Sequence, residues 1–152
     1  MFADADTFAM HQRLVETLYC DTMVLADEAR DYGEHRARGD AAALDPAASV
    51  VFSCESLRLT TRLMHLLGWL LNHRAIAAGE LCASGTSTRL VGVAPTDAAL
   101  RAKLPIQAAI LIEASEALYR RAAILDAAFV AAPPSISPAR ALQQRLAIDL
   151  RG

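Results

Sequence analysis

The segment from Asp45 to Gly79 constrains the fold more than any other part of this 152-residue chain. Aspartate caps helix N-termini, and Pro46 suits the first helical position, while glycine commonly ends a helix. The densest apolar run inside the segment, residues 63–71, has about half of the roughly 20 apolar residues that a membrane span needs. We therefore predict one long helix that does not enter a membrane.

This predicted helix is apolar on two sides, so it is a central bundle member, an interface helix, or both. One stripe consists of Val50, Cys54, Leu57, Thr61, Met64, Gly68, Leu71, Ala75 and Ala78. The other consists of Phe52, Leu59, Leu63, Leu66, Leu70 and Ala77. The second stripe meets either another helix of the chain or a copy of itself, and we predict a homodimer interface at Leu59, Leu63, Leu66 and Leu70. Cys54 we interpret as a small core residue.

Two further segments have the apolar periodicity of amphipathic helices. Residues 7–32 repeat apolar side chains at seven-residue intervals, and Gly33 is a natural stop. Residues 105–131 follow a stripe that consists of Leu104, Leu111, Leu118, Ala122, Leu125 and Phe129. The composition is 54% hydrophobic but only 5% aromatic, which favours helix over sheet. We predict an all-α protein, an antiparallel three-helix bundle.

The segments between and after these helices differ in length. Residues 33–46 are polar and predict a loop, whereas residues 80–104 form a long connection with a short helix after Thr96. Two consecutive prolines then divide a bundle domain, residues 1–132, from a C-terminal tail, residues 133–152. The tail either docks on the bundle or tethers a partner, and we favour the tether. Its apolar residues are Leu142, Leu146 and Leu150.

Charge and cysteine usage exclude several classes of protein. The net charge of −2 gives no general attraction to nucleic acid. The N-terminus lacks the apolar region of a signal peptide, and three widely spaced cysteines favour free thiols. Residues 27–34 are mostly acidic and form either a solvated face or a patch for a basic partner. We expect a cytoplasmic protein that binds neither nucleic acid nor membrane.

The sequence contains none of the common catalytic or metal-binding motifs. Its four histidines form no HExxH pair, and its cysteines form no CxxC pair. The patterns GxGxxG, GxxxxGK(S/T) and GxSxG do not occur. An enzyme built on His65 with Glu55 or Cys54 would lack the rest of a catalytic constellation. We expect no enzymatic activity, no cofactor and no metal.

A third side of the central helix carries polar and aromatic residues at three- and four-residue steps: Glu55, Arg58, Arg62, His65, Trp69 and Asn72. Arginine and tryptophan dominate the binding energy of many protein interfaces. One hypothesis is that a partner binds to Arg58, Arg62, His65 and Trp69. The alternative is that Trp69 packs into the bundle while the two arginines pair with Glu55 and with the first helix.

Three blocks of the sequence resemble a known bacterial family. They are ADEARDYG (26–33), SCESLRLTTRLMHLLGWLLNHRAIAAGE (53–80) and LPIQAAILIEASEALYRRAAILD (104–126). Together they look like the regulators of CtrA degradation (RcdA), and the long, ungapped middle block is the most specific. The resemblance extends from Val24 to Asp126.

What this resemblance implies is a three-helix bundle, usually dimeric, without catalytic activity. Members of the family act as adaptors for the ClpXP protease during the cell cycle. They sit on a protease primed by the response regulator CpdR and bring substrates or a further adaptor, PopA, with contacts from a flexible tail. By resemblance we expect a homodimeric adaptor whose partners are ClpX, a CpdR-like regulator and client proteins. The alternative is a homodimeric structural module with other partners.

Overall fold

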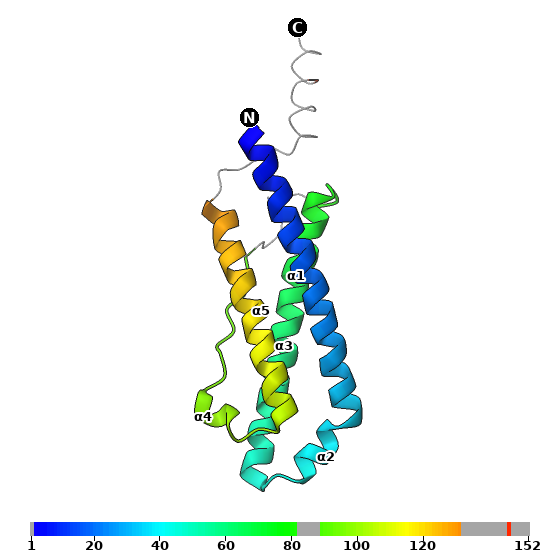
Figure 1. The fold of residues 1–152 in the computed structure, drawn as a ribbon, viewed down its shortest axis with the longest axis vertical. Coiled ribbons are helices and arrows are strands. Elements are labelled where there is room, and N and C mark those ends of the chain that lie inside the picture. The colour runs from blue at the N-terminus through cyan, green and yellow to red at the C-terminus, as the bar shows by residue number, and fades with distance from the viewer. Residues whose placement is uncertain (1, 82–88, 132–145, 147–152) are drawn as a thin grey trace.

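Three long helices lie side by side in the computed structural model, which describes residues 2–81, 89–131 and 146 (Figure 1). They are α1 (Phe2–His35), α3 (Pro46–Ala77) and α5 (Ile106–Ala131). Each of the three contacts the other two, so the helices form an elongated bundle. Within the described residues no strand occurs, and the predicted all-α fold is confirmed.

The central helix, α3, begins and ends where the sequence signals it. Asp45 Oδ1 accepts a hydrogen bond from the backbone N–H of Ala48 at 2.9 Å, and Pro46 is the first helical residue. After the helix, Gly79 has a φ of 77°, a left-handed value that glycine adopts without steric cost. The cap and the stop therefore both act as predicted.

The region around Gly33 differs from the prediction. The first helix begins before residue 7 and continues through Gly33 to His35, and α2 (Ala37–Ala42) follows where a loop was expected. A glycine inside a helix costs about 1 kcal/mol relative to alanine, which tertiary packing can offset. The packing here includes buried Tyr32, whose hydroxyl donates a hydrogen bond to Asp40 Oδ2 at 2.7 Å. This bond joins the end of α1 to α2.

The core consists of the inward faces of the three long helices. Most of the predicted stripe of α5 is buried, and α1 contributes Val15, Leu18 and Leu25. The four leucines predicted to contact a second copy also lie in this core: Leu59, Leu63, Leu66 and Leu70. That prediction is corrected here, because these side chains are already covered within a single chain. The leucine-rich stripe fills the space between three helices, where large branched side chains bury the most area.

The other apolar stripe of α3 faces outward. Leu57 and Met64 on this stripe are exposed, and so is the thiol of Cys54. The interpretation of Cys54 as a core residue is therefore wrong. Two apolar stripes compete for one interior, and the stripe with the smaller residues lies outside.

The connection from α3 to α5 contains a short helix, α4 (Ala98–Arg101), as predicted. Its cap is Asp97 rather than the predicted Thr96, since Asp97 Oδ1 accepts from the backbone N–H groups of Ala99 at 2.8 Å and Leu100 at 3.3 Å. From residue 89 the chain runs alongside the bundle to α4 and then enters α5 (Figure 1).

The division between bundle and tail stays a prediction. The third long helix ends at Ala131, close to the predicted boundary at residue 132. Of the three tail leucines, Leu146 is described and exposed, whereas Leu142 and Leu150 lie outside the described residues.

Candidate functional site

The predicted partner-binding strip of α3 is divided between the interior and the surface. Arg62 and Trp69 keep only 1% and 4% of their accessible surface, so both are core residues. Arg58 is exposed and His65 is half-buried. The hypothesis of an exposed strip is therefore wrong for Arg62 and Trp69. A role of Arg58 and His65 in binding stays a prediction.

Buried Arg62 lies among polar groups of α5 and of the α3–α5 connection. Its guanidinium donates to Ser115 Oγ at 2.8 Å and to the carbonyl oxygen of Ala94 at 3.2 Å, and lies 3.6 Å from Glu116 Oε1. Burial lowers the pKa of Arg62, while the charges of Glu116 and Glu55 oppose that shift. Arg62 thus pairs with α5, and not with α1 as the alternative interpretation expected.

The connection also supplies partners to two buried carboxylates of the bundle. Thr96 donates from Oγ1 to Glu55 Oε2 and from its backbone N–H to Glu116 Oε1, each at 2.6 Å. Arg101 donates to Glu116 Oε2 at 2.6 Å, and Arg58 donates to Glu55 Oε1 at 3.0 Å. An unpaired buried charge costs several kcal/mol, so these contacts fix the connection against the bundle.

Trp69 anchors a second contact between the bundle and the connection. Its indole Nε1 donates to Asp126 Oδ1 at 3.1 Å, and Arg89 donates to Asp126 Oδ2 at 3.1 Å. The indole ring lies near the rings of His73 and Phe129, with centroid distances of 4.3 and 6.2 Å. Trp69 therefore packs between α3 and α5, which is the role that the alternative interpretation gave it, while Asp126 links it to Arg89 of the connection.

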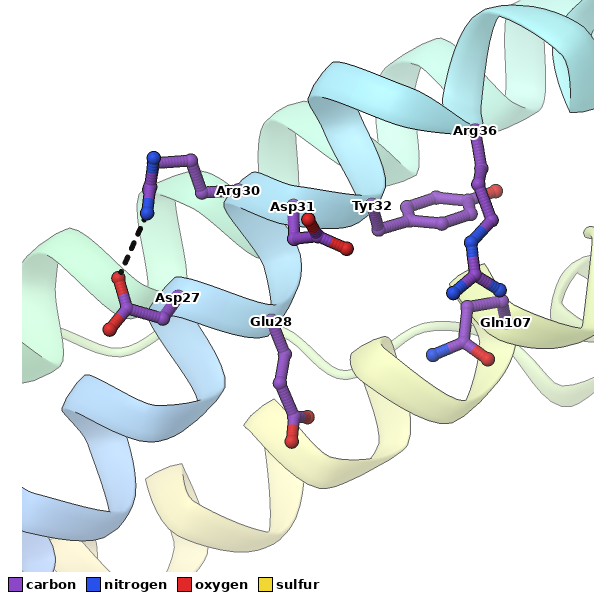
Figure 2. A pocket seen from close by; sticks show the side chains of 7 residues that line it. All are labelled: Asp27, Glu28, Arg30, Asp31, Tyr32, Arg36 and Gln107. Carbon is purple, nitrogen blue, oxygen red and sulfur yellow. Dashed lines mark ion pairs between the residues drawn. The ribbon is translucent and has the colours of Figure 1, made fainter.

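The acidic run of α1 borders an open groove, drawn in Figure 2. The groove is lined by Asp27, Glu28, Arg30, Asp31, Tyr32, Arg36 and Gln107. Arg30 lies 3.5 Å from Asp27 and 3.5 Å from Glu34, while His35 lies 3.1 Å from Asp31. Exposed pairs of this kind contribute little to stability. Charges of both signs favour the interpretation as a solvated face.

Glu55 and Cys54, the candidate partners of His65, lie on different faces of α3. Within residues 2–81, 89–131 and 146, no group of three or more His, Cys, Asp or Glu side chains could hold a metal ion. Glu55 is buried and bonded to Arg58 and Thr96, whereas Cys54 is on the exposed side of α3. In the same part of the chain, no helix is long and apolar enough to cross a membrane.

Apolar side chains gather on the outward face of α3, which sequence reasoning did not select as a site. Its largest members are Val50, Leu57, Met64 and Leu71, with exposed fractions of 64%, 69%, 67% and 48%. Smaller residues alternate with them: Cys54, Thr61, Gly68 and Ala75. We call these eight residues the outer seam. Throughout α3, which is described in full, Arg58 is the only charged residue that is exposed. An apolar patch with so few charges is typical of an interface.

Fold and surface together define an all-α three-helix bundle whose candidate site is a surface for binding macromolecules. The family described as "Protein of unknown function (DUF1465)" matches residues 7–149, and the chain belongs to this family. The chain is also similar to a solved structure, the "Crystal Structure of RcdA from Caulobacter crescentus CB15". The two are 32% identical with a TM-score of 0.62, over 74% of this chain and 88% of RcdA. No curated protein matches the chain.

Proposed function

We propose that this protein is a non-catalytic adaptor that helps to deliver substrates or further adaptors to the ClpXP protease. The observation that carries the proposal is the 32% identity to RcdA, which extends over 88% of that chain. The proposal places the protein in the cytoplasm, as a homodimer that takes part in cell-cycle regulated proteolysis. Its partners are ClpX, a CpdR-like response regulator and client proteins.

The distribution of polar groups supports a binding role. The buried carboxylates of Glu55, Glu116 and Asp126 all accept hydrogen bonds from the connection or from neighbouring helices. Their contacts hold the bundle together, so these groups serve the fold. The surface offers an apolar seam with few charges, which suits a protein partner.

Affinity capture from a bacterial cytoplasmic extract tests the adaptor proposal. Two baits are compared, the full chain and a chain that ends at Ala132. We expect the full chain to retain ClpX or a CpdR-like response regulator. Loss of that capture with the shorter bait would assign the contact to the tail. If neither bait retains either protein, the adaptor proposal is wrong.

A third bait tests the exposed residue of the predicted strip. In Arg58→Glu the charge of a surface side chain is reversed, while Glu55 keeps its hydrogen bond from Thr96. We expect this bait to retain less partner than a matched Arg30→Glu bait, whose change lies in the exposed groove of α1. Equal retention by the two baits would exclude Arg58 from partner binding.

The second candidate function is a homodimeric structural module with other partners. The outer seam favours it, because an apolar face of this length suits self-association more directly than it suits any particular protease. A chain that captures neither ClpX nor the response regulator, yet has the mass of a dimer in light scattering, would support this candidate over the adaptor.

A further inference from the structure

Gly68 is not required by anything in the single chain. It lies inside α3 and is exposed, and a Cβ built there would meet nothing within 4 Å beyond its adjacent residues and the nearby backbone of its own helix. Glycine is the poorest helix former apart from proline, so packing and helix propensity would both accept a larger residue. A position without a side chain permits the close approach of another backbone or side chain. Gly68 therefore points to a neighbour outside the described residues.

The outer seam around Gly68 is a heptad pattern of two side-chain sizes. Large residues occupy one position of each heptad: Val50, Leu57, Met64 and Leu71. Small residues occupy the other position: Cys54, Thr61, Gly68 and Ala75. Two apolar positions repeated every seven residues are the pattern by which one helix packs along another. The seam is exposed from Val50 to Leu71 and half-buried at Ala75, so the helix that this pattern fits is not among the described residues.

We propose that the outer seam of α3 binds the outer seam of a second copy of this chain, with the two α3 helices antiparallel. A two-fold axis between Thr61 and Met64 sets Leu57 against the partner's Gly68. The same axis sets Cys54 against the partner's Leu71. Every layer then pairs a large residue with a small one, as close packing requires. In a parallel pair each residue would meet its own copy, which gives alternately crowded and hollow layers.

The charge and the area of the seam fit this arrangement. The two Arg58 side chains would lie about 14 Å apart along the axis, beyond the roughly 8 Å over which charges act in physiological salt. With 32 residues, α3 is about 48 Å long. A strip about 12 Å wide over that length buries roughly 1,200 Å² on the two copies together, the lower end of stable interfaces.

The antiparallel arrangement has a consequence for an adaptor. In the single chain, the end of α5 at Ala131 lies at the same end of the bundle as the end of α3 (Figure 1). In an antiparallel pair of α3 helices, the C-terminal end of α5 in one copy and that of the other copy lie at opposite ends of the dimer. This inference rests on the homodimer of the proposed function and does not depend on its protease partner.

Light scattering of Gly68→Glu tests the interface. The space around Gly68 is open in the single chain, so the melting temperature should be unchanged or higher at a protein concentration where the wild type is monomeric. Dimerisation should be at least about tenfold weaker. The matched control is Ile124→Glu on α5, a change from an exposed apolar residue to an acid outside the seam, which should stay dimeric. A fully dimeric Gly68→Glu protein would overturn the inference. A monomeric wild-type chain would overturn the homodimer as well, whereas capture of ClpX by that monomer would leave the adaptor role standing.

Disulfide cross-linking tests the direction of the helices. The parent protein carries Cys20→Ser and Cys82→Ser and keeps Cys54, and Leu71→Cys is added to it. We expect rapid oxidation to a covalent dimer only with the added cysteine, because the antiparallel pair sets position 71 against the partner's Cys54. In the parent, the two copies of Cys54 lie about 26 Å apart along the axis. Cross-linking of the parent, or none with the added cysteine, would overturn the antiparallel arrangement.

Discussion

A simple amphipathic helix buries its apolar side chains and exposes its charged ones, whereas the two faces of α3 depart from this arrangement in opposite directions. The inner face buries Glu55 and Arg62 among leucines, while the outer face exposes Leu57 and Met64. The inner charges are tolerated because α5 and the connection supply hydrogen-bond partners for them. The comparison teaches that the supply of partners, more than polarity, decides which side of this helix is buried.

On the outer face of α1, too, the charged side chains have partners. The exposed charged residues between Asp27 and His35 pair largely with one another across neighbouring turns, as on a solvated helix face. Next to the outer seam of α3 there is a single exposed charged residue, Arg58. Of these two surfaces, only the seam has the composition of an interface.

The largest effect is expected from Arg62→Met, which removes one member of the buried polar cluster. Glu116 loses an ion-pair partner, and the carbonyl oxygen of Ala94 and the hydroxyl of Ser115 lose their donor. Breaking a buried pair on one side costs about 3–5 kcal/mol. We expect the free energy of unfolding, measured by urea denaturation, to fall by about that amount.

The matched control for this prediction is Arg58→Met. Arg58 is exposed, and Glu55 would keep the hydrogen bond from Thr96, so the loss should stay below about 1 kcal/mol. Equal losses in the two variants would show that the inner charges do not depend on their buried partners, and the contrast between the faces of α3 would then fail.

The next largest effect is expected from truncating a leucine of α3, and its size should depend on which face of the helix the leucine occupies. Leu66 is completely buried, so Leu66→Ala should lower the free energy of unfolding by about 2–5 kcal/mol at any protein concentration. Leu57 is 69% exposed, so Leu57→Ala should change it by less than about 0.5 kcal/mol in dilute solution. With a seam-to-seam dimer, the effect of Leu57→Ala grows with protein concentration, since binding stabilises only the folded state. A large, concentration-independent effect at Leu57 would show that the outer face is packed within the chain.

Much of the fold could be predicted because its signals are local. Asp45, Pro46 and Gly79 act through their own backbone geometry, so the limits of α3 follow from the sequence. The continuation of α1 through Gly33 could not be predicted in this way, because the hydrogen bond from Tyr32 to Asp40 overrides a weak stop signal.

The candidate site was harder to predict for a related reason. Both stripes of α3 have helical periodicity, and periodicity does not tell which one faces the core. The informative signal was the position of Trp69 and Arg62 beside the leucine stripe, since the partners of these side chains lie on α5 and on the connection. The partners on α5, Ser115 and Asp126, are more than fifty residues away in the chain, and the partner on the connection, Ala94, is 32 residues away. Alternating large and small residues in the outer seam were a second signal that the sequence already carried.

A smaller effect is expected from Thr96→Val, which tests how far the inner charges hold the connection. Valine keeps the shape of threonine but removes the donor to Glu55 Oε2, so a loss of about 1–3 kcal/mol is expected. The backbone amides of α4, next to Thr96, should exchange their hydrogens faster, because local opening becomes easier. The control is Thr60→Val, whose hydroxyl is exposed and bonds only within its own helix. Unchanged exchange in α4 would show that Thr96 does not fasten the connection.

The smallest effect is expected at Tyr32, a buried residue of α1 whose hydroxyl donates a hydrogen bond to Asp40. Burial, and then the hydrogen bond to Asp40, raises the pKa of Tyr32 above its ordinary value of 10.0. The folded state therefore keeps this proton at a pH where the unfolded chain has lost it. The resulting stability is fully present below pH 10 and is lost as the pH rises above that value.

The variant Tyr32→Phe separates the contribution of the Tyr32 hydroxyl to the free energy of unfolding from the contributions of other titrating groups. At about pH 8 the variant should be less stable than the wild type by about 1 kcal/mol, the net value of one hydrogen bond. At about pH 11 the difference in unfolding free energy should shrink, because only the wild type loses stability through Tyr32. Tyr119, whose pKa burial also raises, remains in both proteins and leaves the same alkaline slope in each. A difference that stays constant with pH would mean that the Tyr32 hydroxyl titrates alike in the folded and unfolded states. The polar groups of α1 would then depend less on their partners than those on the inner face of α3 do.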